Sequence, residues 1–333
     1  MSSTPLSSVV ITTRNRKDEL RNALASVLLQ TGPAEVIVID DASTDGTADM
    51  VRAEFPGVRL HRSEVARGLI VQRNIAAELA RSPIIVSLDD DAVFTSPHTL
   101  AQTIAAFDHP RVGAVTIPFI DVGHRPDVIG VAPDRRGIYI AGTYIGAAHA
   151  VRRELFLRLG GYRGYLFQYA EERDFCVRML NAGYVTRLGT ADVVHHFLSP
   201  KRPHSRGYIF RARSFLLYPW YNAPTLYLPF HFAAAAFNMM KFGVRERHPI
   251  WTAWGIIRGC VASVHELPRR RPVTTRTYRL SQELMRRGHM PLIEAEGRLE
   301  PPAFGDLPPV TAGELPGVEA RQSTTPEQTV GSE

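Results

Sequence analysis

The sequence predicts an α/β fold in which a mostly parallel sheet is flanked by helices and followed by a helical extension. Short runs of β-branched residues alternate along the chain with stretches of helical periodicity. Acidic residues follow two of these runs directly, at the edge where open α/β sheets bind ligands. A later stretch of apolar segments without this alternation predicts the extension.

The first hundred residues carry the alternation most clearly. Strands are expected at residues 8–13, 36–39 and 84–88, because each is a short apolar run bounded by turn formers or charge. Helices are expected at residues 17–29 and 48–55, where apolar residues recur at helical spacing. This order of strand and helix predicts a parallel, doubly wound sheet.

Carboxylates gather where two of these strands end. Asp40 and Asp41 follow the second strand, and the triplet Asp89, Asp90 and Asp91 follows the third. Adjacent carboxylates repel one another, and a divalent cation carrying a phosphorylated ligand would offset this. The triplet alone is equally consistent with a solvated acidic loop, but two acidic strand ends in one sheet favour a metal site. Alternate residues of an extended segment point the same way, so Asp89 and Asp91 can converge on one site while Asp90 faces elsewhere.

Five motifs in this order resemble those of family 2 glycosyltransferases, which have the GT-A fold. They are TTRNR (residues 12–16), VIVIDDASTDGT (36–47), GLIVQRN (68–74), SLDDDAVF (87–94) and YAEERDFCVR (169–178). The resemblance covers roughly residues 8–213. It implies a Rossmann-like GT-A domain with a nucleotide-sugar-binding half at 1–115 and an acceptor half at 116–213.

The resemblance also implies a nucleotide-diphosphate sugar as donor, bound together with Mn²⁺ or Mg²⁺. Asp91 would hold the metal, and Asp89 would share the metal or contact the ribose. The residues implied as contacts of the nucleotide sugar are Thr13, Arg14, Asp40, Asp41, Arg73, Asp89 and Asp90. For Arg73 the alternative is a solvated arginine on a helix surface.

An acceptor hydroxyl attacks an anomeric carbon poorly while it is protonated, so a carboxylate is expected nearby as general base. Glu171, Glu172 and Asp174 are the candidates, at a predicted helix start. Glu172 stands where the family mostly has Asp, and we predict that it is the base, with Asp174 as a helper or structural partner. The alternative is that these acids stabilise the helix N-terminus through its dipole.

A further metal ligand is expected at the end of another short strand, residues 193–197. His195 and His196 are both candidates, because imidazole suits Mn²⁺ or Zn²⁺. Adjacent strand residues point to opposite faces, so only one of them can reach the site. We predict His196, and the other histidine would be held by ordinary packing.

The chain is basic, with a net charge of +6 over 333 residues, which indicates anionic partners. No nucleic-acid-binding module is recognisable, so nucleic acid is not expected as a partner. Residues 214–298 are expected to form the helical extension, whose apolar stretches at 218–242 and 250–264 adjoin arginine clusters. These stretches would dock at an anionic membrane surface or pack as an ordinary helical extension.

The remaining expectations concern the tail, the location and the activity. Residues 299–333 are rich in Pro, Gly and polar residues, which predicts a disordered tail. The N-terminus lacks a secretory signal pattern, so the expected location is the cytoplasm, at the inner face of the cell membrane. The predicted activity is metal-dependent, inverting transfer of a sugar to a hydroxyl of a glycan, a lipid-linked glycan or a small molecule. A catalytically silent GT-A module that binds nucleotide or glycan as a scaffold is the alternative.

Overall fold

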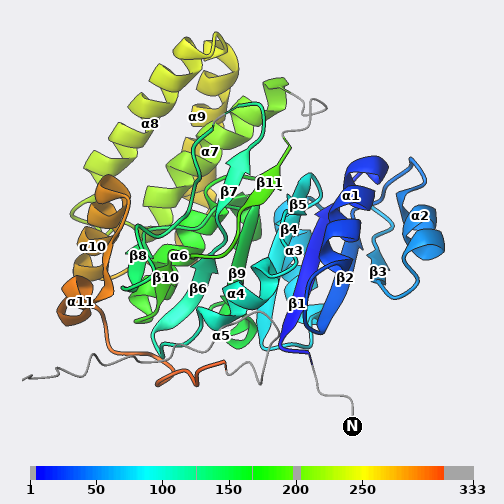
Figure 1. The fold of residues 1–333 in the computed structure, drawn as a ribbon. Helices are drawn as coiled ribbons and strands as arrows, with labels where there is room; N and C mark the ends of the chain where they lie inside the picture. The colour runs from blue at the N-terminus through cyan, green and yellow to red at the C-terminus, as the bar shows by residue number, and fades with distance from the viewer. Residues whose placement is uncertain (1–4, 125, 167, 198–203, 311–333) are drawn as a thin grey trace, which may run out of the picture.

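The computed structural model describes residues 5–124, 126–166, 168–197 and 204–310 (Figure 1). The strands are β1 (Ser7–Thr13), β2 (Ala34–Asp40), β3 (Arg59–Arg62), β4 (Ile84–Asp89), β5 (Ala92–Phe94), β6 (Val112–Thr116), β7 (Phe119–Asp121), β8 (Tyr139–Ala141), β9 (Ala148–Arg152), β10 (Val185–Arg187), β11 (Val194–His196) and β12 (Met290–Pro291). The α-helices are α1 (Lys17–Leu28), α2 (Thr47–Glu54), α3 (Leu69–Leu79), α4 (Thr99–Ala105), α5 (Arg153–Arg158), α6 (Glu171–Asn181), α7 (His204–Asn222), α8 (Leu228–Arg245), α9 (Pro249–His265), α10 (Thr275–Arg287) and α11 (Leu292–Ala295). Short 3₁₀ turns lie at Gly164–Leu166, Leu267–Arg269 and Glu296–Arg298.

The strands of the described residues form two sheets. The larger has the order β12-β8-β10-β6-β9-β4-β1-β2-β3, and the smaller has the order β5-β11-β7. The first four strands pair in parallel, as predicted, because helices connect them. Beyond β4 the sheet is mixed, since β9 runs antiparallel to both β4 and β6 and β8 runs antiparallel to β10. The expectation of a mostly parallel sheet therefore describes the N-terminal part of the sheet.

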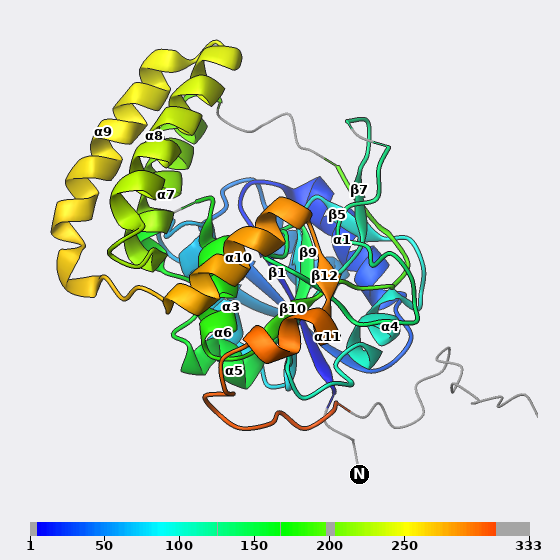
Figure 2. The same cartoon turned by 90° about the vertical axis from the view of Figure 1, so that its left-hand side faces the viewer.

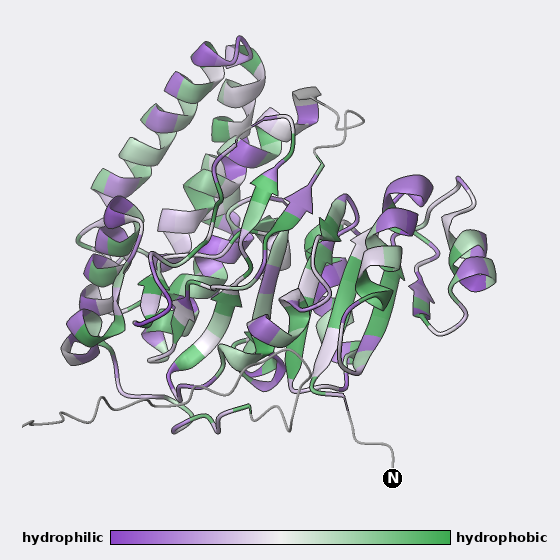
Figure 3. Cartoon of the chain, in the orientation of Figure 1, coloured by the Kyte–Doolittle hydropathy of each residue, from purple (hydrophilic) through white to green (hydrophobic). Residues whose placement is uncertain are grey.

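The central strands are buried on both faces. Val9, Ile11 and Val38 belong to one apolar core, and Val10 and Ile37 belong to the other, because successive strand residues point to opposite sides. Figure 2 shows α1 and α4 on one face of the sheet and α3, α5 and α6 on the other. The hydrophobic colour of the central strands in Figure 3 follows from this two-sided burial.

The C-terminal extension is helical, as predicted, and its helices α8 and α9 project beyond the sheet (Figure 2). Its first helix, α7, begins at His204, ahead of the expected boundary at residue 214, and continues through Pro219. The apolar stretch 218–242 is therefore divided between α7 and α8 rather than forming one segment. Among the described helices, none combines the length and the apolar character needed to cross a membrane.

The prediction of a disordered tail from residue 299 is wrong for residues 299–310. Arg111 donates a hydrogen bond to the carbonyl oxygen of Glu300, and Arg152 donates one to that of Pro308. The ring hydroxyl of Tyr184 donates to the carbonyl of Gly305. Hydrogen bonds from the domain to the backbone hold this segment even though it has few apolar side chains of its own. Residues 311–333 lie outside the described part of the chain.

Candidate active site

The acidic residues predicted to meet do so at one edge of the large sheet. Parallel pairing sets Thr13 of β1 opposite Asp40 of β2 and Thr12 opposite Asp89 of β4. The carboxyl ends of these strands therefore share an edge, as in other open α/β sheets. The small sheet brings a further strand to this edge, because β11 pairs with β5 and sets His196 opposite Ala92.

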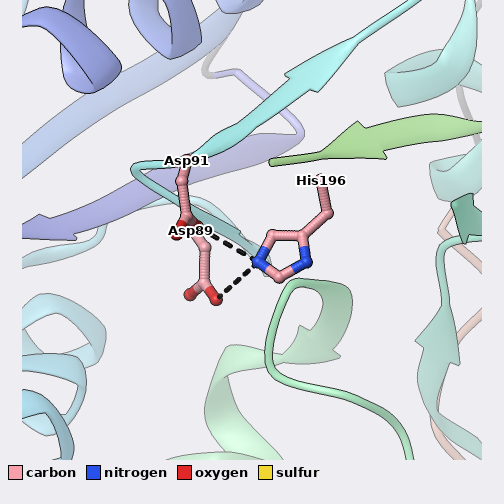
Figure 4. A group of neighbouring side chains, drawn as sticks. All are labelled: Asp89, Asp91 and His196. Atoms are coloured by element: carbon pink, nitrogen blue, oxygen red, sulfur yellow. Dashed lines mark ion pairs between the residues drawn. The ribbon is translucent and has the colours of Figure 1, made fainter. Parts of the chain in front are cut away.

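Asp89, Asp91 and His196 form a compact group with the donor set of a metal site (Figure 4). One ligand atom from each lies within 4.8 Å of the others. Nε2 of His196 is 3.1 Å from Oδ1 of Asp91 and 4.0 Å from Oδ2 of Asp89. Two carboxylates and one imidazole suit Mn²⁺, Mg²⁺ or Zn²⁺. The donor set and its spacing therefore fit the divalent cation predicted from the sequence.

Asp121, which the sequence analysis did not single out, sets the orientation of His196. Its Oδ1 lies 2.6 Å from Nδ1 of His196, which leaves Nε2 directed towards Asp89 and Asp91. A carboxylate behind a histidine is the usual arrangement where the histidine binds a metal. Burial acts to lower the pKa of His196, but hydrogen bonds to Asp91 and Asp121 outweigh it and raise the pKa to about 9. His195 does not join the group and packs edge-on against Phe197, because it lies on the opposite face of β11.

Asp90 turns inward, away from the candidate metal site. It accepts hydrogen bonds from Oγ1 of Thr13 and from the Arg16 guanidinium, both at 2.7 Å. Burial raises its pKa to about 6. Arg16 also pairs with Asp91 at 2.9 Å, so it neutralises two of the three triplet carboxylates, a role that the sequence analysis missed. The hydroxyl of Thr13 is therefore used in a hydrogen bond to Asp90, and the neighbouring Arg14 is exposed to solvent.

Arg73 connects the candidate metal site, Asp89, Asp91 and His196, to the predicted base. Its guanidinium lies 2.7 Å from Asp89, 3.5 Å from Glu171 and 3.6 Å from Glu172. The side chain also donates to the carbonyl oxygen of Gly146. Burial alone would lower the pKa of Arg73, but Asp89 and the other acids hold it above its usual value. Only 5 % of Arg73 is exposed, so the alternative of a solvated arginine on a helix surface is wrong.

Glu171 and Glu172 lie in the first turn of α6. The backbone just before this helix has an uncommon conformation, which directs the first turn towards the site. The two preceding residues, Tyr169 and Ala170, have φ values of 69° and 65°, a region that non-glycine residues seldom adopt. Glu171 is buried, whereas the Glu172 side chain remains 18 % exposed and can reach a ligand. Burial raises the pKa of both, and the Glu171 carboxylate raises that of Glu172 further.

Gly146 supplies the space that Glu172 and Arg73 need. A Cβ at this position would lie 2.5 Å from Oε1 of Glu172 and 3.1 Å from the Arg73 guanidinium. Ile145, the residue before Gly146, lines a cavity of about 240 Å³ together with Phe119 and Tyr144. The Phe119 ring packs edge-on against His196. The cavity therefore adjoins the group of acids, and its walls are largely apolar.

Asp174 does not join this group. It is fully buried and accepts hydrogen bonds from Arg163, Arg178 and Asn222, at 2.8, 3.0 and 2.7 Å. These partners tie α6 to the turn before it and to α7. Of the two roles considered for this residue, the geometry favours the structural partner.

We expect Asp174→Ala to unfold more easily by about 3–5 kcal/mol, because it leaves the largely buried Arg163 and Arg178 without their counter-ion. Urea denaturation of both proteins measures the difference. Asp174→Asn, which keeps the shape and one acceptor oxygen, should lose less. A variant of unchanged stability that fails in sugar transfer would instead make Asp174 part of the reaction.

The carboxylate oxygens of Asp41 already accept hydrogen bonds from groups of this chain. Its carboxylate accepts the backbone N–H groups of Arg67 and Gly68, at 2.7 and 3.0 Å, and Nε2 of Gln72 at 2.5 Å. It therefore fixes the loop that leads into α3, the helix that carries Arg73. The predicted nucleotide contact by Asp41 has no support in this arrangement.

Asp40 keeps more of its acceptor capacity. One oxygen accepts the backbone N–H of Ser43 at 2.8 Å, and the other lies 3.4 Å from Nε of the half-exposed Arg62. Its strand ends at the same sheet edge as Asp89. Asp40 is fully buried, but its Oδ2 accepts no hydrogen bond from the described residues, so of the two acids after β2 it alone keeps an unused acceptor.

Comparisons with known proteins indicate the family and the fold of this chain. The family described as glycosyl transferase family 2 matches residues 8–173. Over 154 residues the chain is 36% identical to the "Succinoglycan biosynthesis protein ExoU" of Rhizobium meliloti (strain 1021), covering 44% of each protein, so it spans under half of that relative. It is 27% identical over 244 residues to the "N-acetylglucosaminyl-diphospho-decaprenol L-rhamnosyltransferase" of Mycobacterium tuberculosis (strain ATCC 25618 / H37Rv), covering 60% of this chain and 77% of the relative.

A solved structure resembles the fold of most of this chain. It is described as mannosyltransferase PcManGT from Pyrobaculum calidifontis in complex with GDP-Man and Mn²⁺, and the TM-score is 0.54. The likeness covers 79% of this chain and 88% of that one at 24% sequence identity. It confirms the predicted GT-A fold.

Proposed function

Because the chain belongs to glycosyl transferase family 2, we propose that it moves a sugar from a nucleotide-diphosphate sugar to an acceptor hydroxyl, with a divalent metal and inversion at the anomeric carbon. One observation carries the proposal. Buried Arg73 connects the Asp89–Asp91–His196 group to Glu172 within 3.6 Å. A site for a cation and a candidate base therefore lie side by side, as a single displacement requires.

The donor half, residues 1–115, would bind the nucleotide sugar. Asp89, Asp91 and His196 would hold the cation, which when bound neutralises the diphosphate as the anomeric bond breaks. Asp40 would accept hydrogen bonds from the base or the ribose. Arg73 fixes the Asp89 carboxylate and adds positive charge beside it, where the leaving group becomes negative.

The acceptor half, residues 116–213, would supply the base. Glu172 is the partly exposed member of the acid pair, so its carboxylate can accept the proton of an acceptor hydroxyl. Its raised pKa makes it a stronger base than an ordinary glutamate once it is ionised. Gly146 leaves room for the carboxylate at that position.

The acceptor would be a glycan or a lipid-linked glycan, in the synthesis of a polysaccharide or glycoconjugate. The relative from Mycobacterium is named for a lipid diphosphate acceptor, and the cavity beside the site has largely apolar walls. We place this reaction in the cytoplasm, at the inner face of the cell membrane. The exposed apolar helices α8 and α9 and the basic charge of the chain support that location.

The alternative is a catalytically silent module that binds the same ligands. The observation in its favour is Glu172, which stands where the family mostly has an aspartate. Release of nucleoside diphosphate distinguishes the two, because a silent module binds the donor without turnover. An acceptor extract that never yields a transferred sugar, with any donor that binds, would favour the module.

We expect one class among UDP-, GDP- and dTDP-sugars to raise the melting temperature, and to do so only with Mn²⁺ or Mg²⁺ present. A ligand that binds only the folded state stabilises it, by about 2.7 kcal/mol at a hundred times its dissociation constant. A thermal-shift panel with and without EDTA measures this. Equal shifts without metal would contradict metal dependence, and no shift with any donor would contradict the proposed donor class.

A further inference from the structure

Helices α8 and α9 carry a continuous set of exposed apolar side chains. On α9 all but Trp251 recur every three or four residues, which places them on one face of the helix, and Trp251 lies at the border of that face. They are Ile250, Trp251, Trp254, Ile257, Val261 and Val264. On α8, Phe230, Phe237 and Val244 recur every seven residues. We call these nine residues the outer face of the hairpin.

The opposite face of α9 is made of small residues that pack against α7. A Cβ on Gly255 would lie 2.5 Å from the carbonyl oxygen of Ile209, and one on Gly259 would lie 3.1 Å from Leu216. Between α8 and α9, Gly243 packs in the same way against Thr252. Gly255, Gly259 and Ser263 recur every four residues along this buried face.

This arrangement is the reverse of that in a helix whose apolar side covers a protein core. In water, large apolar side chains normally face inward, because burying each contributes about 1.5–3 kcal/mol. Small residues inside and bulky apolar residues outside are typical of helices packed within lipid. The nine side chains of the outer face are all exposed, so no other helix of the described chain covers this face.

Charge around the hairpin indicates which apolar environment covers it. Residues 226–271 contain seven basic residues and two acidic ones. The basic residues are Lys241, Arg245, Arg247, Arg258, Arg269, Arg270 and Arg271, and the acidic ones are Glu246 and Glu266. Glu266 is buried and pairs with Arg269. A second copy of this chain would bring the same positive charge to the contact, whereas anionic lipid headgroups complement it.

We propose that the outer face of the α8–α9 hairpin inserts into the interface of an anionic lipid bilayer. The helices would lie along the membrane surface, with Trp251 and Trp254 at headgroup depth, where tryptophan is favoured. At about 1.5 Å per residue, α9 is about 26 Å long, which is shorter than the apolar core of a bilayer. This inference deepens the membrane association proposed above, and it does not depend on the transfer reaction.

The test is flotation of the full chain with vesicles of phosphatidylcholine containing phosphatidylglycerol. We expect wild-type protein to float with these vesicles, and less with pure phosphatidylcholine or at high salt. Ile250→Glu should lower the partition coefficient about tenfold or more, because it moves a charge into the interface. Ile293→Glu on α11 is the matched control, since both isoleucines are 81% exposed, and it should float like wild type.

Tryptophan fluorescence gives a second readout. Two of the three tryptophans lie on the outer face, so brominated lipids should quench the emission of wild-type protein. Protein that stays in solution with both vesicle types, or equal flotation of the two variants, would overturn the inference. So would sedimentation of wild type as a dimer that Ile250→Glu dissociates, because a second copy would then cover this face.

The flotation experiment tests the membrane surface independently of the proposed transfer reaction. Asp91→Asn, which alters the candidate metal site, should float like wild type. Lost transfer with intact flotation would count against the reaction alone, whereas lost flotation with intact donor turnover would count against the membrane surface alone.

Discussion

Glu172→Gln is expected to lower the turnover number for sugar transfer by about 10²- to 10⁴-fold while leaving donor affinity unchanged. The loss is that of a positioned general base. Glutamine keeps the shape of the side chain and its place beside Arg73 and Gly146 but cannot accept the proton of an acceptor hydroxyl. Single-turnover kinetics, with donor binding measured separately by calorimetry, would resolve the two effects.

The pH profile gives this prediction a sign. Burial and the Glu171 carboxylate raise the pKa of Glu172, so its basic form is lost as the pH falls through a pKa above the usual range of a glutamate. We therefore expect the wild-type rate to rise with pH across that range, and the residual rate of Glu172→Gln to lack this dependence.

Glu172→Asp is the matched control, since it keeps a carboxylate and restores the family's usual residue. The side chain is shorter by one methylene, so activity should lie between those of wild type and Glu172→Gln. Full activity in Glu172→Gln, together with loss in Glu171→Gln, would transfer the role of base to Glu171.

The parallel half of the fold could be predicted from local patterns, but the rest of the sheet could not. Strands β1, β2 and β4 are apolar runs joined by periodic helices, and this combination has few other solutions. Strand β9 inserts antiparallel between β4 and β6, and its pairing depends on partners far along the chain. Residues 299–310 appeared disordered because the groups that hold them lie on other segments, such as Arg111 and Arg152.

The residues of the candidate site also include some whose position the sequence could predict and some whose position it could not. The convergence of Asp89, Asp91 and His196 could be predicted because acids and a histidine follow short apolar strands, and ligands bind at the carboxyl ends of such strands. That His196 arrives from a second, smaller sheet could not be predicted. The sequence could not predict that Asp41 and Asp174 turn inward. An aspartate that binds its own chain cannot be told from one that binds a ligand by residue type alone.

Two partners of the site, Arg16 and Asp121, were missed. Each contacts its acid or histidine across about 75 residues of sequence. Arg16 lies three residues after the end of β1 and Asp121 is the last residue of β7, and these positions were the available signals. Charged residues so close to the ends of strands are expected at the sheet edge where ligands bind.

Asp91→Asn is expected to abolish metal-dependent donor binding, and with it to lower transfer by about 10³-fold. A cation that neutralises a diphosphate contributes several kcal/mol, and each 1.36 kcal/mol is tenfold in rate. The substitution removes one charge from the Asp89–Asp91–His196 group. Calorimetric titration of Mn²⁺, with nucleoside diphosphate present, would measure the loss without relying on activity.

Asp90→Asn is the control, because it alters the neighbouring residue of the same triplet. Asp90 is turned towards Thr13 and Arg16, so its substitution should cost about 1–3 kcal/mol of stability and leave Mn²⁺ binding in the folded protein intact. The two variants differ by one position and remove the same charge, yet only Asp91 belongs to the proposed cation site. Equal loss of Mn²⁺ binding in both would mean that the net charge of the acidic triplet, and not the geometry of the Asp89–Asp91–His196 group, holds the metal.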